Sequence, residues 1–498
     1  MAAVSVLSRG SSSLDILSKR LRPSIDIHLE GQTPGLVNSY TTGDHIEGTV
    51  TVSADLDTRF DEVEIVLQGT SQTSVERTSC PGRAGAQQVF LRLRQPIDET
   101  EYPTPRVLEK GRTYQFPFTF VVPDRLLPQV CKHRKNNAHL ERAHTMLPPT
   151  LGDPMLASNG KTLLDDMAPD MSRIAYIVRV AVLRKSTGED RITKSLAGFA
   201  KKVRIVPTVE EEPPISVTET SGYCTRKEKK VKRGLLRGRQ GRLTASSAQP
   251  KPIQLLFPSG EANDSGSTMA TVQLRFDPVG NEQPPRLGSL TSKLRVHTFY
   301  SAEPWEDFVS PSGLTSFSHL SRGLYVQNVP LSTMCVASAQ WTKHSDSSRR
   351  DSMQSTVSED SIAEGETYYT ASVVVPVSLP KTKAFVPTFQ SCLLARIYLL
   401  DLSLSYHPAG KTVLTPTVSL RLPIQFTSQP KYSDSLKTEL SVSVTQAELD
   451  EFFHPRIVAL PNADAVAEVD PTRSETQSLA PPEYSETYST PTVVRAAS

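Results

Sequence analysis

Four residues near the end of the sequence have the types and spacing of a peptide that docks into another protein: Pro481, Pro482, Glu483 and Tyr484. Two adjacent prolines hold φ at about −65° and favour the polyproline II helix. That helix loses little entropy on entering an aromatic-lined groove, such as the groove of a WW domain. Tyr484 adds a ring for a neighbouring pocket and a hydroxyl for a hydrogen bond. We therefore expect a WW-domain partner, with an idle proline-rich segment as the alternative.

The residues between 226 and 239 form a strongly basic run. Such a run contacts anionic lipid, where each cation near the surface contributes on the order of 1 kcal/mol, or an acidic protein segment; it is also typical of a nuclear import signal. The structural alternative is a solvated strand edge, which discourages edge-to-edge pairing. Nucleic-acid binding is not expected, because no aromatic residues interleave with the charges. The candidate contact residues are Arg226, Lys227, Lys229, Lys230, Lys232, Arg233, Arg237 and Arg239.

Three serines are candidate phosphorylation sites. Arg349 and Arg350 lie just ahead of Ser352, which is a pattern that basophilic kinases read, and Ser355 and Ser358 lie near acidic residues, which suits an acidophilic kinase. A phosphate adds roughly −2 charge and could create a docking site for a 14-3-3-type protein. An unmodified loop is the alternative.

Cys131, His133, His139 and His144 lie close together in the sequence and are residue types that bind zinc. Their spacing matches no standard zinc finger, and three neighbouring basic residues would oppose a cation. We therefore expect a loop with solvent-exposed histidines, with no metal and no other cofactor. The five cysteines are far apart and form no CxxC pair, which favours reduced thiols in the cytosol.

No catalytic set stands out in the sequence. Gly-x-Ser-x-Gly, the P-loop, His-Glu-x-x-His and Gly-x-Gly-x-x-Gly are absent. Asp165 and Asp166 are paired carboxylates, but nothing around them fixes the separation that a glycoside hydrolase needs. We expect a protein that is not an enzyme, with a β-sandwich hydrolase as the distant rival.

Alternating apolar residues predict the strands that must position these candidates. The clearest run is Tyr114, Phe116, Phe118, Phe120 and Val122, in which each aromatic or apolar residue alternates with another residue type. Similar runs occur at 25–29, 46–52, 63–67, 89–93, 174–182 and 203–205, and again at 272–276, 294–298, 373–377 and 420–426, whereas 393–406 is a long apolar strand or a bent pair. Each has one apolar face, as a strand of a β-sandwich needs.

The predicted organisation is all-β, with two immunoglobulin-like β-sandwiches in tandem. We expect a disordered N-terminus at 1–20, a first sandwich at 21–208, a hinge at 209–221, a second sandwich at 222–430 with a disordered insertion at 343–366, and a disordered tail at 431–498. The chain has 38 prolines, a net charge of +2 and no apolar run of 18 residues, so no membrane span is expected. The apolar patch from Ala2 to Leu7 is too weak for a secretory signal.

Several stretches resemble the α-arrestin, or arrestin-related, family, most closely its filamentous-fungal branch. The first sandwich carries Tyr40–Val50 (YTTGDHIEGTV), Tyr114–Pro123 (YQFPFTFVVP), Leu147–Gly152 (LPPTLG) and Arg173–Val178 (RIAYIV). The second carries Phe385–Cys392 (FVPTFQSC) and Ile397–Leu399 (IYL). The chain departs from the family in its long 343–366 insertion, its enlarged turn at 130–146 and its single Pro-Pro-x-Tyr.

The resemblance implies two arrestin-like sandwiches and a tail that recruits a HECT-type ubiquitin ligase through residues 481–484. It further implies an adaptor that brings this ligase to the cytosolic segments of membrane transporters or receptors and so promotes their endocytosis. We therefore expect a cytoplasmic protein that works peripherally at the plasma membrane or endosomes. The alternative is a trafficking or signalling scaffold of the same fold that recruits no ligase.

Overall fold

The computed structural model describes residues 22–32, 38–76, 82–153, 164–185, 193–214, 222–233, 237–257, 266–312, 321–345, 367–409 and 415–430. In this part of the chain strands predominate, so the predicted all-β class is confirmed. The helical elements there are short: η1 (Glu99–Glu101), η2 (Pro128–Cys131) and α2 (Ala138–His144). None of these described helices is long and apolar enough to cross a membrane.

The strands up to Ile205 form two main sheets around one hydrophobic core. One sheet has the order β1 (Ser24–Leu29), β3 (His45–Ser53), β8 (Thr113–Val121). The other has the order β2 (Ser39–Tyr40), β10 (Thr193–Ile205), β9 (Ser172–Lys185), β5 (Glu62–Glu76), β6 (Arg83–Arg94). Strands β4 (Thr58–Arg59) and β7 (Val107–Leu108) form a separate small pair. The core takes side chains from both sheets, for example Val50 and Ile65, which makes this set a β-sandwich.

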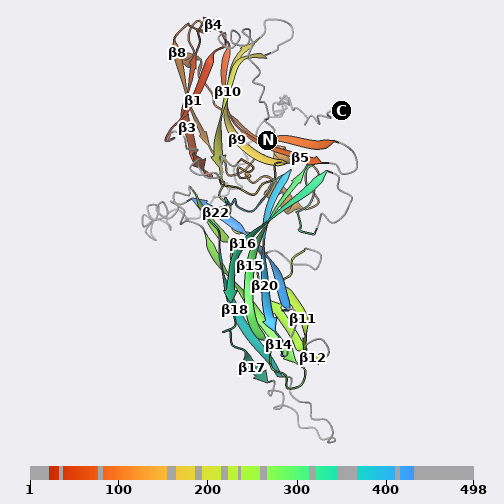
Figure 1. The fold of residues 1–498 in the computed structure, drawn as a ribbon. Coiled ribbons are helices and arrows are strands. Elements are labelled where there is room, and N and C mark those ends of the chain that lie inside the picture. The colour runs from red at the N-terminus through yellow and green to blue at the C-terminus, as the bar shows by residue number, and fades with distance from the viewer. Residues whose placement is uncertain are drawn as a thin grey trace, which may run out of the picture. The chain divides into compact units, whose positions relative to one another are not determined.

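The strands from Arg226 onward form a second set, coloured green to blue in Figure 1. One sheet has the order β11 (Arg226–Arg233), β12 (Arg237–Ser246), β14 (Ser267–Pro278), β18 (Thr367–Ser378), β17 (Thr342–Ser345). The other has the order β16 (Arg322–Cys335), β15 (Arg286–Ser301), β20 (Leu394–His407), β19 (Phe389–Gln390), with β21 (Thr417–Ile424) also paired to β20. A parallel pair, β13 (Ile253–Phe257) and β22 (Phe426–Pro430), completes the set. Both sheets contribute to a second core, for example Leu274 and Leu400.

Strand β8 shows why these sequences form half-buried strands. Its residues alternate between exposed and buried over its whole length, and Phe116, Phe118 and Phe120 all lie on the buried face. Removing each ring from water stabilises the fold by about 1.5–3 kcal/mol. A helix would spread the same rings around its circumference and leave some of them in solvent.

Strand β6 departs from the predicted alternation. Val89, expected on the buried face, is 49% exposed, whereas Phe90 is buried. The register against β5 shifts between Gly69 and Thr70, so Phe90 is the extra residue of a β-bulge. Its ring takes the space above Gly69, where an added Cβ would lie 2.5 Å from Phe90 Cε2. The prediction that Val89 is buried was therefore wrong, because the extra residue of a bulge exchanges the buried and exposed positions on its two sides.

The predicted insertion at 343–366 starts too early. Residues Lys343–Ser345 belong to β17 and pair with β18, because Lys343 and Ser345 lie opposite Tyr369 and Thr367. Residues 346–366, the tail from 431 and the N-terminus to 21 lie outside the described residues. In the predicted hinge, Val209 exchanges backbone hydrogen bonds with Ser428, and residues 215–221 are not described. The domain boundaries themselves stay predictions.

A buried cation connects the two sets of strands. Arg396 of β20 has no exposed surface, and its guanidinium donates to the carbonyl oxygens of Asp166 (3.0 Å) and Met167 (3.2 Å). Asp165, which precedes these two residues in the chain, forms an ion pair with Lys383 at 2.6 Å. Burying a guanidinium costs several kcal/mol unless acceptors surround it, so residues 165–167 must present their oxygens to β20.

Replacing Arg396 with alanine should therefore lower the free energy of unfolding by about 3–5 kcal/mol, because two buried carbonyl groups lose their donors and a cavity remains. Urea or guanidinium denaturation followed by circular dichroism measures the change. Arg286→Ala is the matched control on neighbouring strand β15, since Arg286 is exposed, and it should change stability by no more than about 0.5 kcal/mol. Equal midpoints for the two variants would contradict the role given to the buried guanidinium.

Candidate functional site

The basic run folds into the edge strand β11 and the start of β12. Successive side chains of a strand point to opposite faces, so the run is split between two surfaces. Lys227 lines one hollow, whereas its neighbours Arg226 and Glu228 line another. Of the other predicted contacts, Lys229, Lys230, Lys232, Arg233 and Arg239 are exposed, and the side chain of Arg237 lies outside the described residues. The seven candidate cations whose side chains are described therefore do not make one continuous patch.

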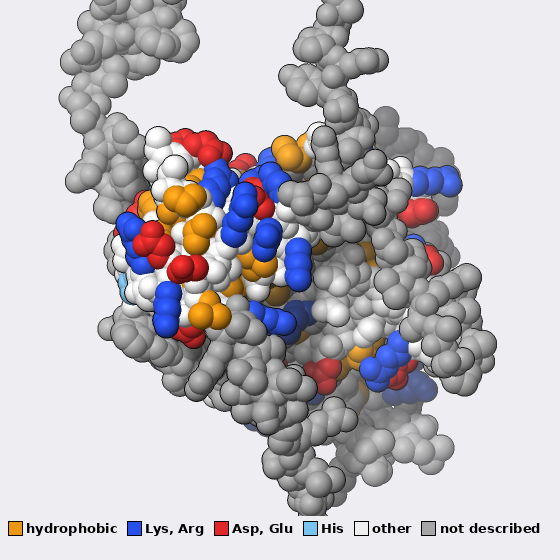
Figure 2. All heavy atoms as spheres, turned by 90° about the horizontal axis from the view of Figure 1, so that it is seen from above, with side chains coloured by type: hydrophobic (Ala, Val, Ile, Leu, Met, Phe, Trp, Pro, Cys, Tyr) orange, Lys and Arg blue, Asp and Glu red, His pale blue; other side chains and the backbone are white. Residues whose placement is uncertain are grey.

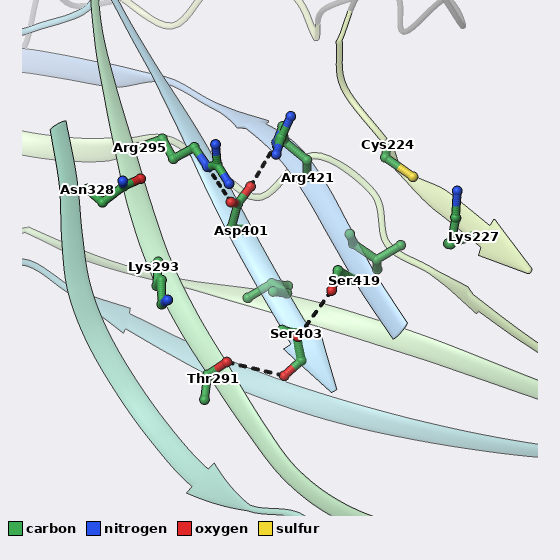
Figure 3. A pocket seen from close by; sticks show the side chains of 12 residues that line it. Cys224, Lys227, Thr291, Lys293, Arg295, Asn328, Asp401, Ser403, Ser419 and Arg421 are labelled. Carbon is green, nitrogen blue, oxygen red and sulfur yellow. Dashed lines mark hydrogen bonds and ion pairs between the residues drawn. The ribbon is translucent and has the colours of Figure 1, made fainter. Parts of the chain in front are cut away.

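The larger hollow, of about 630 Å³, lies on the outward face of the sheet that contains β15, β20 and β21 (Figure 3). This face is outward because Lys293 and Arg295 alternate along β15 with the core residues Leu294 and Val296. Lys227 borders the hollow from β11, across from β21. The sequence analysis found Lys227 and missed the other cations, because they are far apart in the chain.

A single carboxylate, that of Asp401, stands among four cations in the lining of this hollow. Arg295 Nε donates to one of its oxygens, and Arg421 Nε donates to the other at 3.0 Å (Figure 3). Among the described residues, neither Lys227 nor Lys293 has an ion-pair partner. The hollow therefore has an excess of positive charge and favours an anionic ligand.

Hydroxyl groups continue the polar lining beyond Asp401. Thr291 Oγ1 donates to the carbonyl oxygen of Ser403 at 3.4 Å, and the hydroxyls of Ser403 and Ser419 are 3.1 Å apart (Figure 3). These groups can donate to or accept from a peptide backbone, and they can donate to a carboxylate. In the lining of this hollow, no general base lies beside a nucleophile.

The second hollow, of about 420 Å³, lies on the opposite sheet and has nearly balanced charges. Arg226 pairs with Glu228 at 2.9 Å. Arg275 and Arg242 both pair with Asp277, at 2.8 and 3.5 Å. Elsewhere, on the face seen from above in Figure 2, basic, acidic and hydrophobic side chains lie next to one another. The larger hollow is the better candidate for an acidic ligand, because its cations are only partly neutralised.

The remaining predicted sites divide between described and undescribed residues. Pro481, Pro482, Glu483 and Tyr484, and the serines Ser352, Ser355 and Ser358, lie outside the described residues. The paired carboxylates Asp165 and Asp166 lie at the junction around Arg396. Asp165 binds Lys383, and Asp166 accepts from the backbone N–H groups of Gly152 (2.6 Å) and Ala168 (3.1 Å). Their oxygens are thus occupied by structural contacts.

The prediction of solvent-exposed histidines near Cys131 is wrong for His144, which is 1% exposed. It lies at the end of α2, where its Nδ1 is 3.5 Å from Cys131 Sγ. His139 of the same helix is exposed, as predicted. Cys392 lies beside this group although it is far away in the sequence.

The comparisons with known proteins give one relative. No family model matches the chain. Over 231 residues the chain is 25% identical to Bypass of stop codon protein 5 of Saccharomyces cerevisiae. The match covers 37% of this chain and 47% of that protein. The match thus spans about half the length of the relative. This likeness fits the resemblance to the arrestin-related family that the sequence motifs indicate.

His297 lies on the same outward face of β15, and both of its ring nitrogens are buried without a hydrogen-bond partner in the described structure. Burial lowers its pKa from 6.5 to about 4, and Arg295 and Arg421 act in the same direction. Above pH 6.5 the ring is neutral in both the folded and the unfolded state. As the pH falls from 6.5 to 4, the unfolded chain gains a proton that the folded chain does not, so the free energy of unfolding decreases.

The expected loss from this one group by pH 4 is roughly 3 kcal/mol. In His297→Gln, stability should decline less steeply between pH 6.5 and pH 4 than in the wild type. Denaturant midpoints at a series of pH values measure the slope. His139→Gln is the control, since this exposed ring should leave the slope unchanged. The same slope in all three proteins would rule out a buried neutral His297.

Proposed function

We propose that this protein is an arrestin-like adaptor that brings a WW-domain HECT-type ubiquitin ligase to membrane transporters or receptors. Pro481, Pro482, Glu483 and Tyr484 hold the ligase, and the second set of strands holds an acidic cytosolic segment of the cargo. Ubiquitination and endocytosis of the cargo follow from this proximity. The adaptor works in the cytoplasm, at the inner side of the plasma membrane or at endosomes.

The observation that carries the cargo-binding half is the basic hollow around Asp401. It offers Lys227 and Lys293, which have no ion-pair partner in the described part of the chain, and a row of hydroxyls on a β-sheet face. An extended acidic peptide fits such a surface, because its carboxylates meet the cations and its backbone meets the hydroxyls. The likeness to one yeast relative and the all-β fold support an arrestin-like adaptor in general.

A peptide is favoured over a flat lipid surface as the ligand of these residues. The basic run is divided between the two faces of β11, with Arg226 turned away from the hollow that Lys227 lines. A planar bilayer contacts one side of a strand at a time, so it cannot collect the roughly 1 kcal/mol that each cation of a continuous patch contributes. A chain that enters the hollow reaches Lys227, Lys293 and Arg421 together.

The ligase-binding half is tested with Pro482→Ala/Tyr484→Ala in the full chain. Loss of the polyproline II conformation and of the anchoring ring should reduce recovery of WW-domain ligases in a pull-down by at least roughly tenfold. Tyr488→Ala/Pro491→Ala is the matched control, since it removes a tyrosine and a proline of the same segment and should recover the ligase normally. Equal recovery from both double variants would sink the ligase-adaptor proposal.

The alternative is a trafficking or signalling scaffold whose Pro-Pro-x-Tyr binds a WW protein that is not a ligase. Ubiquitination of this chain separates the two functions, because a recruited HECT ligase modifies lysines within its reach. The adaptor requires that ubiquitination of the chain disappear in Tyr484→Ala. If WW binding is lost while ubiquitination stays, the scaffold is the better description.

Charge reversal in the hollow tests the cargo-binding half. Lys227→Glu/Lys293→Glu should weaken binding of an acidic cytosolic peptide by about tenfold or more at low salt, because two attractions become repulsions. Fluorescence anisotropy with a labelled peptide of glutamates and aspartates measures the affinity. Lys230→Glu/Lys343→Glu makes the same change in net charge at two exposed lysines outside the hollow and should change binding by less than about threefold. Equal weakening in both variants would point to net charge rather than to the hollow.

A further inference from the structure

Four side chains of metal-binding type meet at one point of the described structure: Cys131, His133, His144 and Cys392. One ligand atom from each lies within 4.8 Å of all the others. Cys131 Sγ is 3.1 Å from His133 Nε2 and 3.5 Å from His144 Nδ1, and the two ring nitrogens are 3.3 Å apart. Three of these residues come from η2, α2 and the turn between them, and Cys392 comes from the turn between β19 and β20.

These separations are those of a tetrahedral zinc centre. With bonds of about 2.3 Å to sulfur and about 2.0–2.1 Å to nitrogen, zinc separates its ligand atoms by roughly 3.3–3.8 Å. The three distances among Cys131, His133 and His144 agree with this range to within a few tenths of an ångström. All four ligand atoms gather in one small region, as the ligands of a single ion do.

The tautomer of His133 also fits a ligand. Its Nδ1 lies 2.9 Å from the carbonyl oxygen of Arg134 and can only donate there. A neutral ring then presents the lone pair of Nε2 to Cys131 and His144. Zinc-bound histidines regularly donate their second N–H to a carbonyl in this way. The other histidine, His144, turns Nδ1 to the group, and its buried Nε2 has no hydrogen-bond partner in the described structure.

Burial and charge suit a closed site. Cys131, His144 and Cys392 are each at most 2% exposed. Two thiolates and two neutral imidazoles balance the charge of a divalent cation, so the centre can be buried without excess charge. The Lys135 ammonium group, expected to oppose a metal, bonds the Cys131 carbonyl oxygen at 2.7 Å, pairs with Glu141 at 3.2 Å and donates to Cys131 Sγ at 3.8 Å, where it favours the thiolate form. Its effect on the centre is therefore partly offset.

The structure assigns to Cys131, His133, His144 and Cys392 a structural Zn²⁺ site. Mixed thiolate and imidazole ligands select zinc over magnesium or calcium, which prefer oxygen. All four positions come from the protein, which is typical of structural rather than catalytic zinc. Binding by two thiols releases two protons, and no oxidation or reduction occurs.

The site would tie the α2 segment to the start of β20. The same contact region includes the Asn136 side chain, which donates to Asp307 at 2.8 Å, and the backbone N–H of Asn136, which donates to Glu306 at 2.9 Å. Without metal, these two cysteines and two histidines are a cluster of polar side chains held mainly by hydrogen bonds to one another. Zinc binding therefore stabilises the enlarged turn at 130–146 against the second set of strands.

The test is the metal content of the full chain, purified without a polyhistidine tag. Mass spectrometry of the metal should find about one Zn²⁺ per chain in the wild type. In Cys392→Ser and His144→Gln, zinc affinity measured by chelator competition should fall on the order of 100-fold or more, since even loss of an outer hydrogen bond costs 10–100-fold. The matched controls Cys335→Ser and His139→Gln change exposed residues outside the group and should keep the metal.

A second measurement needs no variant. The chelator-treated wild type, given Co²⁺ alone, should develop the visible absorption of tetrahedral cobalt and a thiolate charge-transfer band, and Zn²⁺ should erase both. Wild-type protein that carries no zinc and takes up no cobalt under reducing conditions would overturn the assignment. So would a Cys131–Cys392 disulfide in protein purified under reducing conditions, or equal zinc affinity in Cys392→Ser and Cys335→Ser.

Discussion

The buried guanidinium of Arg396 is the constraint on which the arrangement of the described strands depends. A cation without access to solvent must be surrounded by hydrogen-bond acceptors. Residues 165–167 supply two carbonyl oxygens, with Met167 held at a positive φ of 59°. That backbone conformation is unusual outside glycine, and Asp166 holds it through bonds to Gly152 and Ala168. The junction is therefore defined by hydrogen-bond geometry and not by apolar packing alone.

The period of two in a β-strand governs function as well as packing. It places Lys293 and Arg295 outside and Leu294 and Val296 inside on the same strand. It also divides the basic run of β11, so that a feature continuous in sequence becomes two surfaces of different charge balance. The candidate cargo site takes only Lys227 from that run and gathers its other cations from β15 and β21.

Local patterns in the sequence predicted the class of fold and most strands, because alternation is visible within ten residues. They failed where a distant residue decides the outcome. Phe90 is buried because Gly69 on the neighbouring strand leaves room for a bulge. His144 is buried in a group that also contains Cys392, which is far away in the sequence. The hollow was found only through Lys227, since nothing local connects that residue with Asp401, whereas the Pro-Pro-x-Tyr could be read directly because its four residues are adjacent.

Asp401 has a consequence for how long a ligand stays. Its carboxylate already accepts hydrogen bonds from the Nε groups of Arg295 and Arg421. An acidic side chain of a ligand therefore competes with Asp401 for these two guanidinium groups. Each new ion pair with the ligand therefore replaces an existing pair with Asp401, so the net gain in binding free energy is smaller. Such competition shortens the residence time of an acidic ligand, and a short residence time is what the proposed cargo adaptor requires if it serves one membrane protein after another.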